Sequence, residues 1–242
     1  MTVSVSTVIT TFDASTATGA HVLDSPSWTP GNGSIILAGI TVRALTGAYT
    51  ITGGGLTWTE LLQTGSANDV RMVVWSATGG GGVMTAEASY TASGAISGKS
   101  LFIIAEVGAH NGVGSIAGTT TAGATTLVVG TAVTTSNNSG IFIFTGNRAG
   151  SDLLFDANYT VQTSMVNSAS GYTLAAALWS DTDADAAGSR TVQWGQNPGT
   201  SITSRAMVMV EIKQALSGGF DYNLLEARVM RGAGRGVMRG VA

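Results

Sequence analysis

The stretch LFIIAEV at residues 101–107 decides the fold, because β-branched and aromatic residues at this density predict a β-strand. A similar stretch, MVMVEI, occupies residues 207–212. Each contains a single glutamate just before its last apolar residue, and these two, Glu106 and Glu211, are 105 positions apart. The two stretches therefore predict the same strand at matching places in two halves of the chain.

Short segments rich in β-branched and aromatic residues lie on both sides of these two stretches along the chain. Many alternate apolar with polar residues, as strands with one buried face do. Turn-forming glycines, asparagines and serines separate them, for example at residues 30–33, 79–82 and 136–140. Between residues 2 and 213 no apolar stripe with helical spacing is sustained, so we predict an all-β fold. The predicted strand windows are residues 3–9, 34–43, 70–76, 83–90, 100–107, 141–145, 159–165, 172–179, 190–194 and 205–213.

Two further matches indicate an internal repeat. Residues 33–37 resemble residues 139–143, and residues 73–76 resemble residues 177–180, with Trp75 and Trp179 104 positions apart and a turn after each segment. Such nearly constant spacing predicts a duplicated half of about 100 residues. The alternative is chance similarity, which sequence rich in glycine, threonine and alanine makes more frequent.

The join between the halves, at about residues 112–139, contains no proline and no charged residue. A flexible interdomain linker is usually more polar or contains proline. We therefore expect residues 1–214 to form one antiparallel jelly-roll-type β-sandwich of about ten to thirteen strands, rather than two small domains in tandem.

Residues 215–242 differ from the rest of the chain. They carry four arginines and two acidic residues, a net charge of +2, against seven basic and twelve acidic residues, a net charge of −5, in residues 1–214. Asn223 and Glu226 resemble a capping box, and Gly232 would end a short helix that is too short to be stable alone. The sequence VMRG stands at residues 229–232 and again at 237–240. We predict a basic C-terminal arm, part helix and part extended, that orders on a neighbouring subunit through Leu224, Leu225, Arg228, Val229, Met230, Arg231, Arg235, Met238 and Arg239.

The composition excludes several classes of protein. Charged residues make up only 10% of the chain and the net charge is −3, which disfavours a generally basic nucleic-acid binder, while 44% apolar residues suffice for a packed core. Without cysteine, disulfides, thiol catalysis and cysteine-based metal centres are excluded. The N-terminal residues do not resemble a signal peptide, and no apolar stretch has the length of a membrane helix. We expect a protein made in a cytoplasm without a secretion signal.

Residues that could carry chemistry are few. His21 and His110 stand in no catalytic motif, and no Gly-x-Ser-x-Gly sequence is present. We therefore predict no catalytic residues and no enzymatic activity.

One acidic turn is a weak candidate for calcium. Asp181, Asp183 and Asp185 offer alternate carboxylates, which suit Ca²⁺. The glycine and the glutamate of a calcium loop are replaced by Ala186 and Val192, so a solvated acidic turn is the favoured interpretation. We expect no cofactor, with Ca²⁺ as the alternative.

Tryptophans and arginines leave two binding alternatives open. The five tryptophans could form a sugar-binding platform, but the matching places of Trp75 and Trp179 favour packing in the core. The Arg-Gly steps in the arm resemble nucleic-acid-binding segments only faintly, because they are three and lack aromatic residues. Docking on protein is the favoured use of the arm.

The order of these landmarks resembles the β-sandwich modules of structural proteins in tailed bacteriophages and prophages. The resemblance rests on residues 25–39, on GLTWTEL at residues 55–61, on residues 70–77 and on residues 101–108, and it spans about residues 20–213. It implies a non-enzymatic virion protein, either a capsid decoration (cement) protein or a tail fibre or baseplate component. The arm is not part of the pattern.

The primary hypothesis is a virion structural subunit that forms a homo-oligomer, for which a trimer is a guess, and binds other virion proteins. Low charge and many small residues suit broad, weakly charged contact surfaces. The alternatives are a carbohydrate-binding module for receptor recognition and, far behind, a hydrolase.

Overall fold

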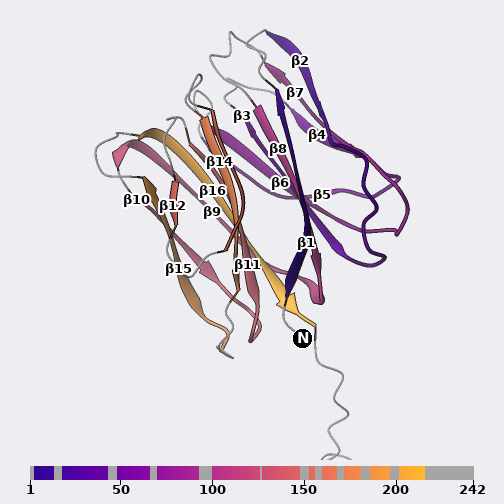
Figure 1. Cartoon of the computed structure of the whole chain (residues 1–242). Helices are drawn as coiled ribbons and strands as arrows, with labels where there is room; N and C mark the ends of the chain where they lie inside the picture. Colours follow the sequence, from indigo (N-terminus) through magenta and orange to yellow (C-terminus); the bar gives the residue numbers. More distant parts are fainter. Residues whose placement is uncertain are drawn as a thin grey trace, which may run out of the picture.

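A computed structural model describes residues 3–13, 18–42, 48–65, 70–92, 100–125, 127–147, 153–155, 160–167, 172–180, 186–196 and 202–215. These residues form sixteen strands in four antiparallel sheets and contain no helix (Figure 1). The all-β prediction is confirmed. The predicted short helix between Asn223 and Gly232 and the rest of the arm lie outside the described residues.

Residues 3–108, called the first half, contain eight strands in two sheets. Inner sheet 1 has the order β1-β8-β3-β6-β5, and outer sheet 1 has the order β2-β7-β4. The strands are β1 (Ser4–Asp13), β2 (Gly19–Asp24), β3 (Ile35–Val42), β4 (Tyr49–Gly53), β5 (Thr59–Gly65), β6 (Arg71–Thr78), β7 (Ala86–Ala92) and β8 (Ser100–Gly108).

Residues 110–215, called the second half, contain the other eight strands. Inner sheet 2 has the order β13-β14-β11-β16-β9, and outer sheet 2 has the order β10-β15-β12. The strands are β9 (His110–Thr125), β10 (Leu127–Val133), β11 (Gly140–Asn147), β12 (Leu153–Phe155), β13 (Thr160–Asn167), β14 (Tyr172–Ser180), β15 (Ser189–Gln196) and β16 (Ile202–Gln214).

The same strand order therefore occurs twice. Adding eight to each strand number of the first half gives the order of the second half in both sheets. No strand of one half pairs with a strand of the other among the described residues. The β-sheets of the two halves are therefore separate and have equal topology.

The four sheets stack in layers, with the inner sheets face to face and an outer sheet on each side (Figure 1). Alternate residues of β3 point to opposite sides. Ile35 and Leu37 enter a central core with Phe142 and Phe144 of β11, whereas Ile36 enters the core under outer sheet 1. The central strands of the inner sheets, β3, β8, β11 and β16, are buried on both faces, which explains why their sequences contain long apolar runs.

The architecture differs from the single sandwich of ten to thirteen strands that the sequence predicts. Several additional strands are weak in sequence, such as β9, whose glycines, threonines and alanines have little β-specific pattern. Most of the uncharged join at residues 112–139 is strand rather than linker. This stretch belongs to β9 and β10, which are members of the two sheets of the second half.

Candidate functional site

The described loops of both halves gather at one end of the stack, called the tail end. Here β1 begins, β8 passes into β9 through Ala109, and β16 ends. The Ala215 amide donates a hydrogen bond to the Ala109 carbonyl at 3.1 Å, and Nε2 of His110 lies 2.9 Å from the Gly33 carbonyl oxygen. The chain leaves for residues 216–242 from this end, beside the N-terminus (Figure 1).

A buried carboxylate, Glu211 of β16, organises the tail end of the second half. Its side chain is 1% exposed. Oε1 accepts hydrogen bonds from the amides of Thr135 (2.7 Å) and Ser136 (3.1 Å), and it lies 2.7 Å from the Ser139 hydroxyl. Oε2 accepts from the Ser115 amide (2.7 Å) and the Thr135 hydroxyl (2.9 Å). The carboxylate thus ties the β10–β11 turn and strand β9 to the last strand.

These donors keep the carboxylate charged. Burial raises the pKa of Glu211, but the hydrogen bonds from Ser115, Ser139 and Thr135 lower it by more, so the pKa lies below the usual value for glutamate. An ionised carboxylate surrounded by donors has no proton to give and no open lone pair facing a ligand. Glu211 therefore has a structural role and holds the turn and β9 against β16.

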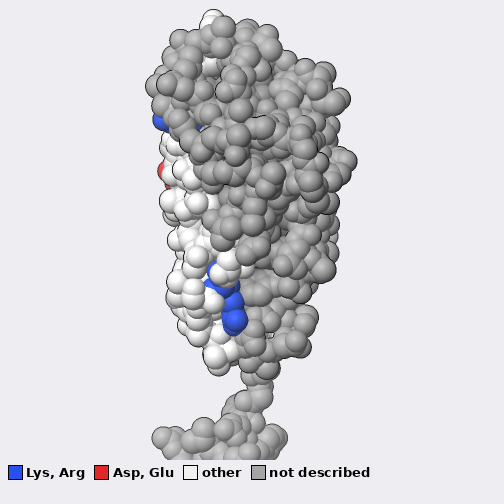
Figure 2. Space-filling model, turned by 90° about the vertical axis from the view of Figure 1, so that its left-hand side faces the viewer, with Lys and Arg blue, Asp and Glu red and all other residues white. Residues whose placement is uncertain are grey.

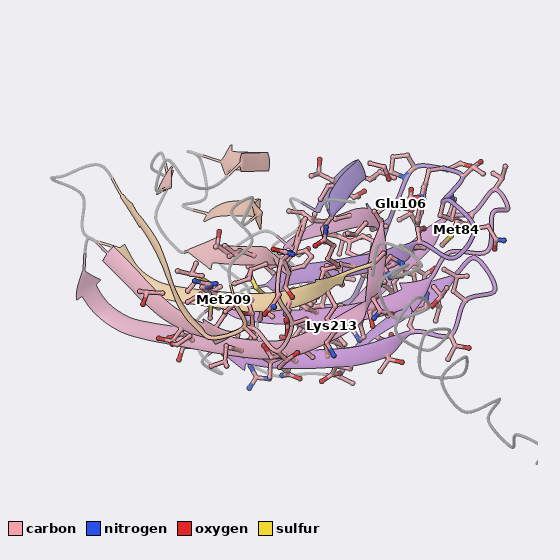
Figure 3. The ribbon with its side chains drawn as sticks, turned by 90° about the horizontal axis from the view of Figure 1, so that it is seen from below. Met84, Glu106, Met209 and Lys213 are labelled. Carbon is pink, nitrogen blue, oxygen red and sulfur yellow. The ribbon has the colours of Figure 1, made fainter. Side chains whose placement is uncertain are left out.

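Glu106 of β8 occupies the matching place in the first half and is also buried, near the tail end (Figure 3). Its Oε1 accepts a hydrogen bond from the Gly31 amide at 2.7 Å, as Glu211 Oε1 does from Ser136. The residue before Gly31 is Pro30, which has no amide hydrogen, whereas the residue before Ser136 is Thr135. This one difference removes two of the donors that Glu211 has.

The backbone around the two carboxylates repeats as well. Gly33 (φ 75°) and Asn138 (φ 57°) are both left-handed, a conformation that glycine and asparagine tolerate best. Ser34 and Ser139 follow them, and each hydroxyl bonds the carbonyl three residues earlier. All three pairs are 105 positions apart. The two turns are copies of one motif.

A β-bulge lies beside each carboxylate. The register of β1 against β8 shifts between Val5 and Thr7, and the register of β9 against β16 shifts between the partners of Val210 and Ile212. In the second half the bulge contains Gly114, where an added Cβ would overlap the Glu211 carboxylate. A glycine is therefore required for the carboxylate to reach the Ser115 amide.

A second polar group lies in the core of the first half. His21, Tyr90 and Tyr49 form a row across the inner face of outer sheet 1, with ring centroids 4.8 Å apart for His21 and Tyr90 and 6.3 Å apart for the two tyrosines. All three side chains are buried. Burial raises the pKa of Tyr49 above its usual value, against the opposing effect of Arg71. The row packs the sheet and presents no open surface.

The residues singled out in the sequence have varied outcomes. Asp181, Asp183 and Asp185 and all nine arm residues from Leu224 to Arg239 lie outside the described residues. Trp28 and Trp75 are buried and Trp58 is half-buried, with the indole of Trp58 bonded to the Gly53 carbonyl. These three do not form an exposed platform.

The match between Trp75 and Trp179 is wrong by two residues in the strand register. Trp75 pairs with Ala38, whereas Trp179 pairs with Ile141, which matches Ile36. Similarly, the resemblance of residues 33–37 to 139–143 is out of register by one, because Ser34 matches Ser139. The spacing of the glutamates is the correct one.

Sequence reasoning used Glu106 and Glu211 as landmarks and missed their role. The available signal was one carboxylate inside an otherwise apolar strand, which must be satisfied if the strand is buried. The donors come from the β10–β11 turn and from strand β9, which are 72 to 96 residues away from Glu211, so the sequence could not identify them.

The described residues contain no group of three or more histidines and acids placed to hold a metal ion. They also contain no helix that is long and apolar enough to cross a membrane. On the face in Figure 2, the described atoms belong mostly to uncharged residues.

No protein-family model, no curated protein and no solved structure matches this chain. A function for it therefore has to come from its own residues.

Proposed function

We propose that this protein is a non-enzymatic structural subunit of a tailed-bacteriophage virion, which oligomerises and binds other virion proteins. A capsid decoration (cement) protein or another surface-exposed subunit is the favoured role. The observation that carries the proposal is the anchoring of residue 215 on the stack, where Ala215 bonds to Ala109. The basic arm therefore begins at a fixed point of a rigid body.

The strand orders support a jelly-roll-type body. In each half, the order β1-β8-β3-β6, or β9-β16-β11-β14, faces the order β2-β7-β4, or β10-β15-β12. This order resembles that of an eight-stranded jelly roll in which the fifth strand has joined the edge of the inner sheet, and it supports a jelly-roll-type body. Such sandwiches serve as rigid building blocks in capsids.

The surface supports assembly rather than recognition of a strongly charged partner. The exposed face of outer sheet 1 carries Thr50, Thr52 and Thr91, and its acids Asp24 and Glu87 stand directly opposite each other. Like charges side by side repel each other, and a basic segment docking there would relieve the repulsion. The arm, with a net charge of +2, has the complementary sign.

The test compares the full-length chain with a chain truncated after Ala215, by light scattering and by incorporation into particles. If the arm is a tether, the full-length protein forms an oligomer and enters particles, whereas the truncated protein keeps its β-type circular dichroism but is monomeric and left out. The matched control replaces Arg228, Arg231, Arg235 and Arg239 with glutamine, which keeps the length of the arm. A truncated protein that assembles normally would contradict the tether.

A glycan array separates the assembly role from receptor recognition. The proposal would be overturned in favour of a carbohydrate-binding module if the full-length protein bound a defined glycan and particles assembled normally without this protein. Immunogold labelling of particles then distinguishes a place on the capsid from one in the tail.

A further inference from the structure

The contact between the two halves has a geometry that the duplication alone does not require. Glu106 bonds to the Gly31 amide as Glu211 bonds to the Ser136 amide, and the corresponding residues of the two pairs are 105 positions apart. Each residue of the inner strands β3 and β8 therefore corresponds to the residue 105 positions later. The strand register agrees, because Gly39 pairs with Ile103 and Phe144 pairs with Val208. Gly39 of β3 therefore matches Phe144 of β11, and Thr41 matches Gly146.

These matching residues touch each other across the central core. A Cβ added to Gly39 would lie 2.5 Å from Cδ1 of Phe144, so the ring of Phe144 rests on the bare backbone of Gly39. A Cβ added to Gly146 would lie 2.5 Å from Cγ2 of Thr41. At both positions, a residue meets its own counterpart, and a large side chain in one half meets a glycine in the other.

A residue contacts its own symmetry mate only when it lies next to a two-fold axis, as in the isologous interface of a homodimer. Two such self-contacts on one pair of strands, in the same order, place the axis along β3 and β11. The edges agree with this, because β5 lies against β9 and β1 against β13, which are the two reciprocal contacts that a two-fold axis produces.

We infer that the two halves meet in the central core across a pseudo-two-fold axis, as two copies meet in a homodimer. Two residue pairs, Gly39 with Phe144 and Thr41 with Gly146, select the unlike half as the partner of each inner face. Two first halves would leave a void between two copies of Gly39 and place Thr41 against Thr41. Two second halves would bring Phe144 against Phe144, where the structure has room for one ring. The partner of each inner face is therefore the other half, and a second copy of the same half is excluded.

The test exchanges the residues across the axis in the full-length chain and measures the midpoint of urea unfolding. Gly39→Phe and Phe144→Gly each lower the midpoint, the first by overlap of two rings and the second by a cavity. If the positions are equivalent, the double variant G39F/F144G recovers most of the summed loss. The control is G39F/F102G, because Phe102 lies on the opposite face of inner sheet 1, in the core under outer sheet 1, and its loss should add to that of G39F.

The smaller pair gives an independent result if the phenylalanine variants do not fold. Thr41→Gly and Gly146→Thr change only three side-chain heavy atoms each, and the double variant T41G/G146T should return close to the midpoint of the original chain. Recovery in the exchanged pairs, with additive losses in the control, supports the two-fold interface. Recovery no greater than in the control would overturn it, because equivalent positions on an axis must tolerate the exchange.

Discussion

The two buried carboxylates occupy the same position in two copies of one motif, yet they are held very differently. Glu211 has two backbone amides, two hydroxyls and a third amide from β9 within hydrogen-bonding distance, whereas the side chain of Glu106 accepts a hydrogen bond from the Gly31 amide. The turn of the first half is also closed through its backbone, since Gly33 and Ser34 exchange hydrogen bonds with Gly79. Topology fixes where a carboxylate lies, and the local sequence fixes what depends on it.

The largest expected effect comes from removing each carboxylate in turn. Glu211→Ala leaves several buried donors without an acceptor and should lower the free energy of unfolding by about 4 kcal/mol. Glu106→Ala should lower it by about 1 to 2 kcal/mol, because fewer donors lose their partner. Urea unfolding of both variants measures the two losses. Equal losses would show that the number of donors is not what distinguishes the two halves.

The bulges beside the carboxylates give the next effect. Gly114→Ala pushes a methyl group into the Glu211 carboxylate and should lower the free energy of unfolding by about 2 kcal/mol. The control is Ser6, which lies in the matching bulge and is exposed. Ser6→Ala should change the free energy of unfolding by less than about 0.5 kcal/mol. The outcome that contradicts this is an unchanged melting temperature for Gly114→Ala.

The dependence of stability on pH sharpens the comparison further. The pKa of Glu211 is lowered in the folded protein, so its stabilising contribution is complete above the pKa of the unfolded chain, about 4.3, and is lost as the pH falls through the folded pKa. Between pH 5 and pH 2, the loss of stability should therefore be smaller in Glu211→Gln than in the original chain. The measurement is the urea midpoint of both proteins across this pH range. If the midpoints of the two proteins fell in parallel with pH, Glu211 would not be the group that stabilises the fold.

The smallest effect concerns the central core. Thr41 Oγ1 is buried and has no hydrogen-bond partner among the described residues, while the matching residue of the second half is Gly146, which has no side chain. Thr41→Val keeps the shape and removes the unsatisfied hydroxyl, so it should raise the free energy of unfolding by up to about 1 kcal/mol. Thr50→Val, at an exposed hydroxyl bonded to Ser89, is the control and should give no gain. A loss of stability in Thr41→Val would mean that the hydroxyl is satisfied.

Much of the strand content could be predicted because composition and alternation are local properties. The windows at residues 34–43, 70–76, 100–107 and 205–213 all contain strands. The strands that were missed, such as β4 and β12, are short, and β9 is built from small residues whose place is set by neighbours rather than by their own preference. The spacing of the glutamates predicted the repeat more accurately than the tryptophans, because a buried carboxylate needs its turn while a tryptophan can shift along its strand.

The role of the carboxylates could not be predicted, because their donors lie on turns and on a strand that are far away in the sequence. The candidate residues of the arm, from Leu224 to Arg239, remain predictions for the truncation experiment to test. The acidic turn at Asp181, Asp183 and Asp185 likewise remains a weak prediction for Ca²⁺, which a titration of the purified protein can test.

The sequence by itself determined an all-β chain with a repeated glutamate-containing strand, because β-branched residues, alternation and turn glycines act over a few neighbours. Only the tertiary structure decided that the repeats form four layers, that their inner sheets meet in one core, and that Phe144 rests on Gly39. The physical reason is that burial on both faces of a sheet depends on which other sheet covers it. That choice is made by side-chain volumes brought together from residues more than 100 positions apart.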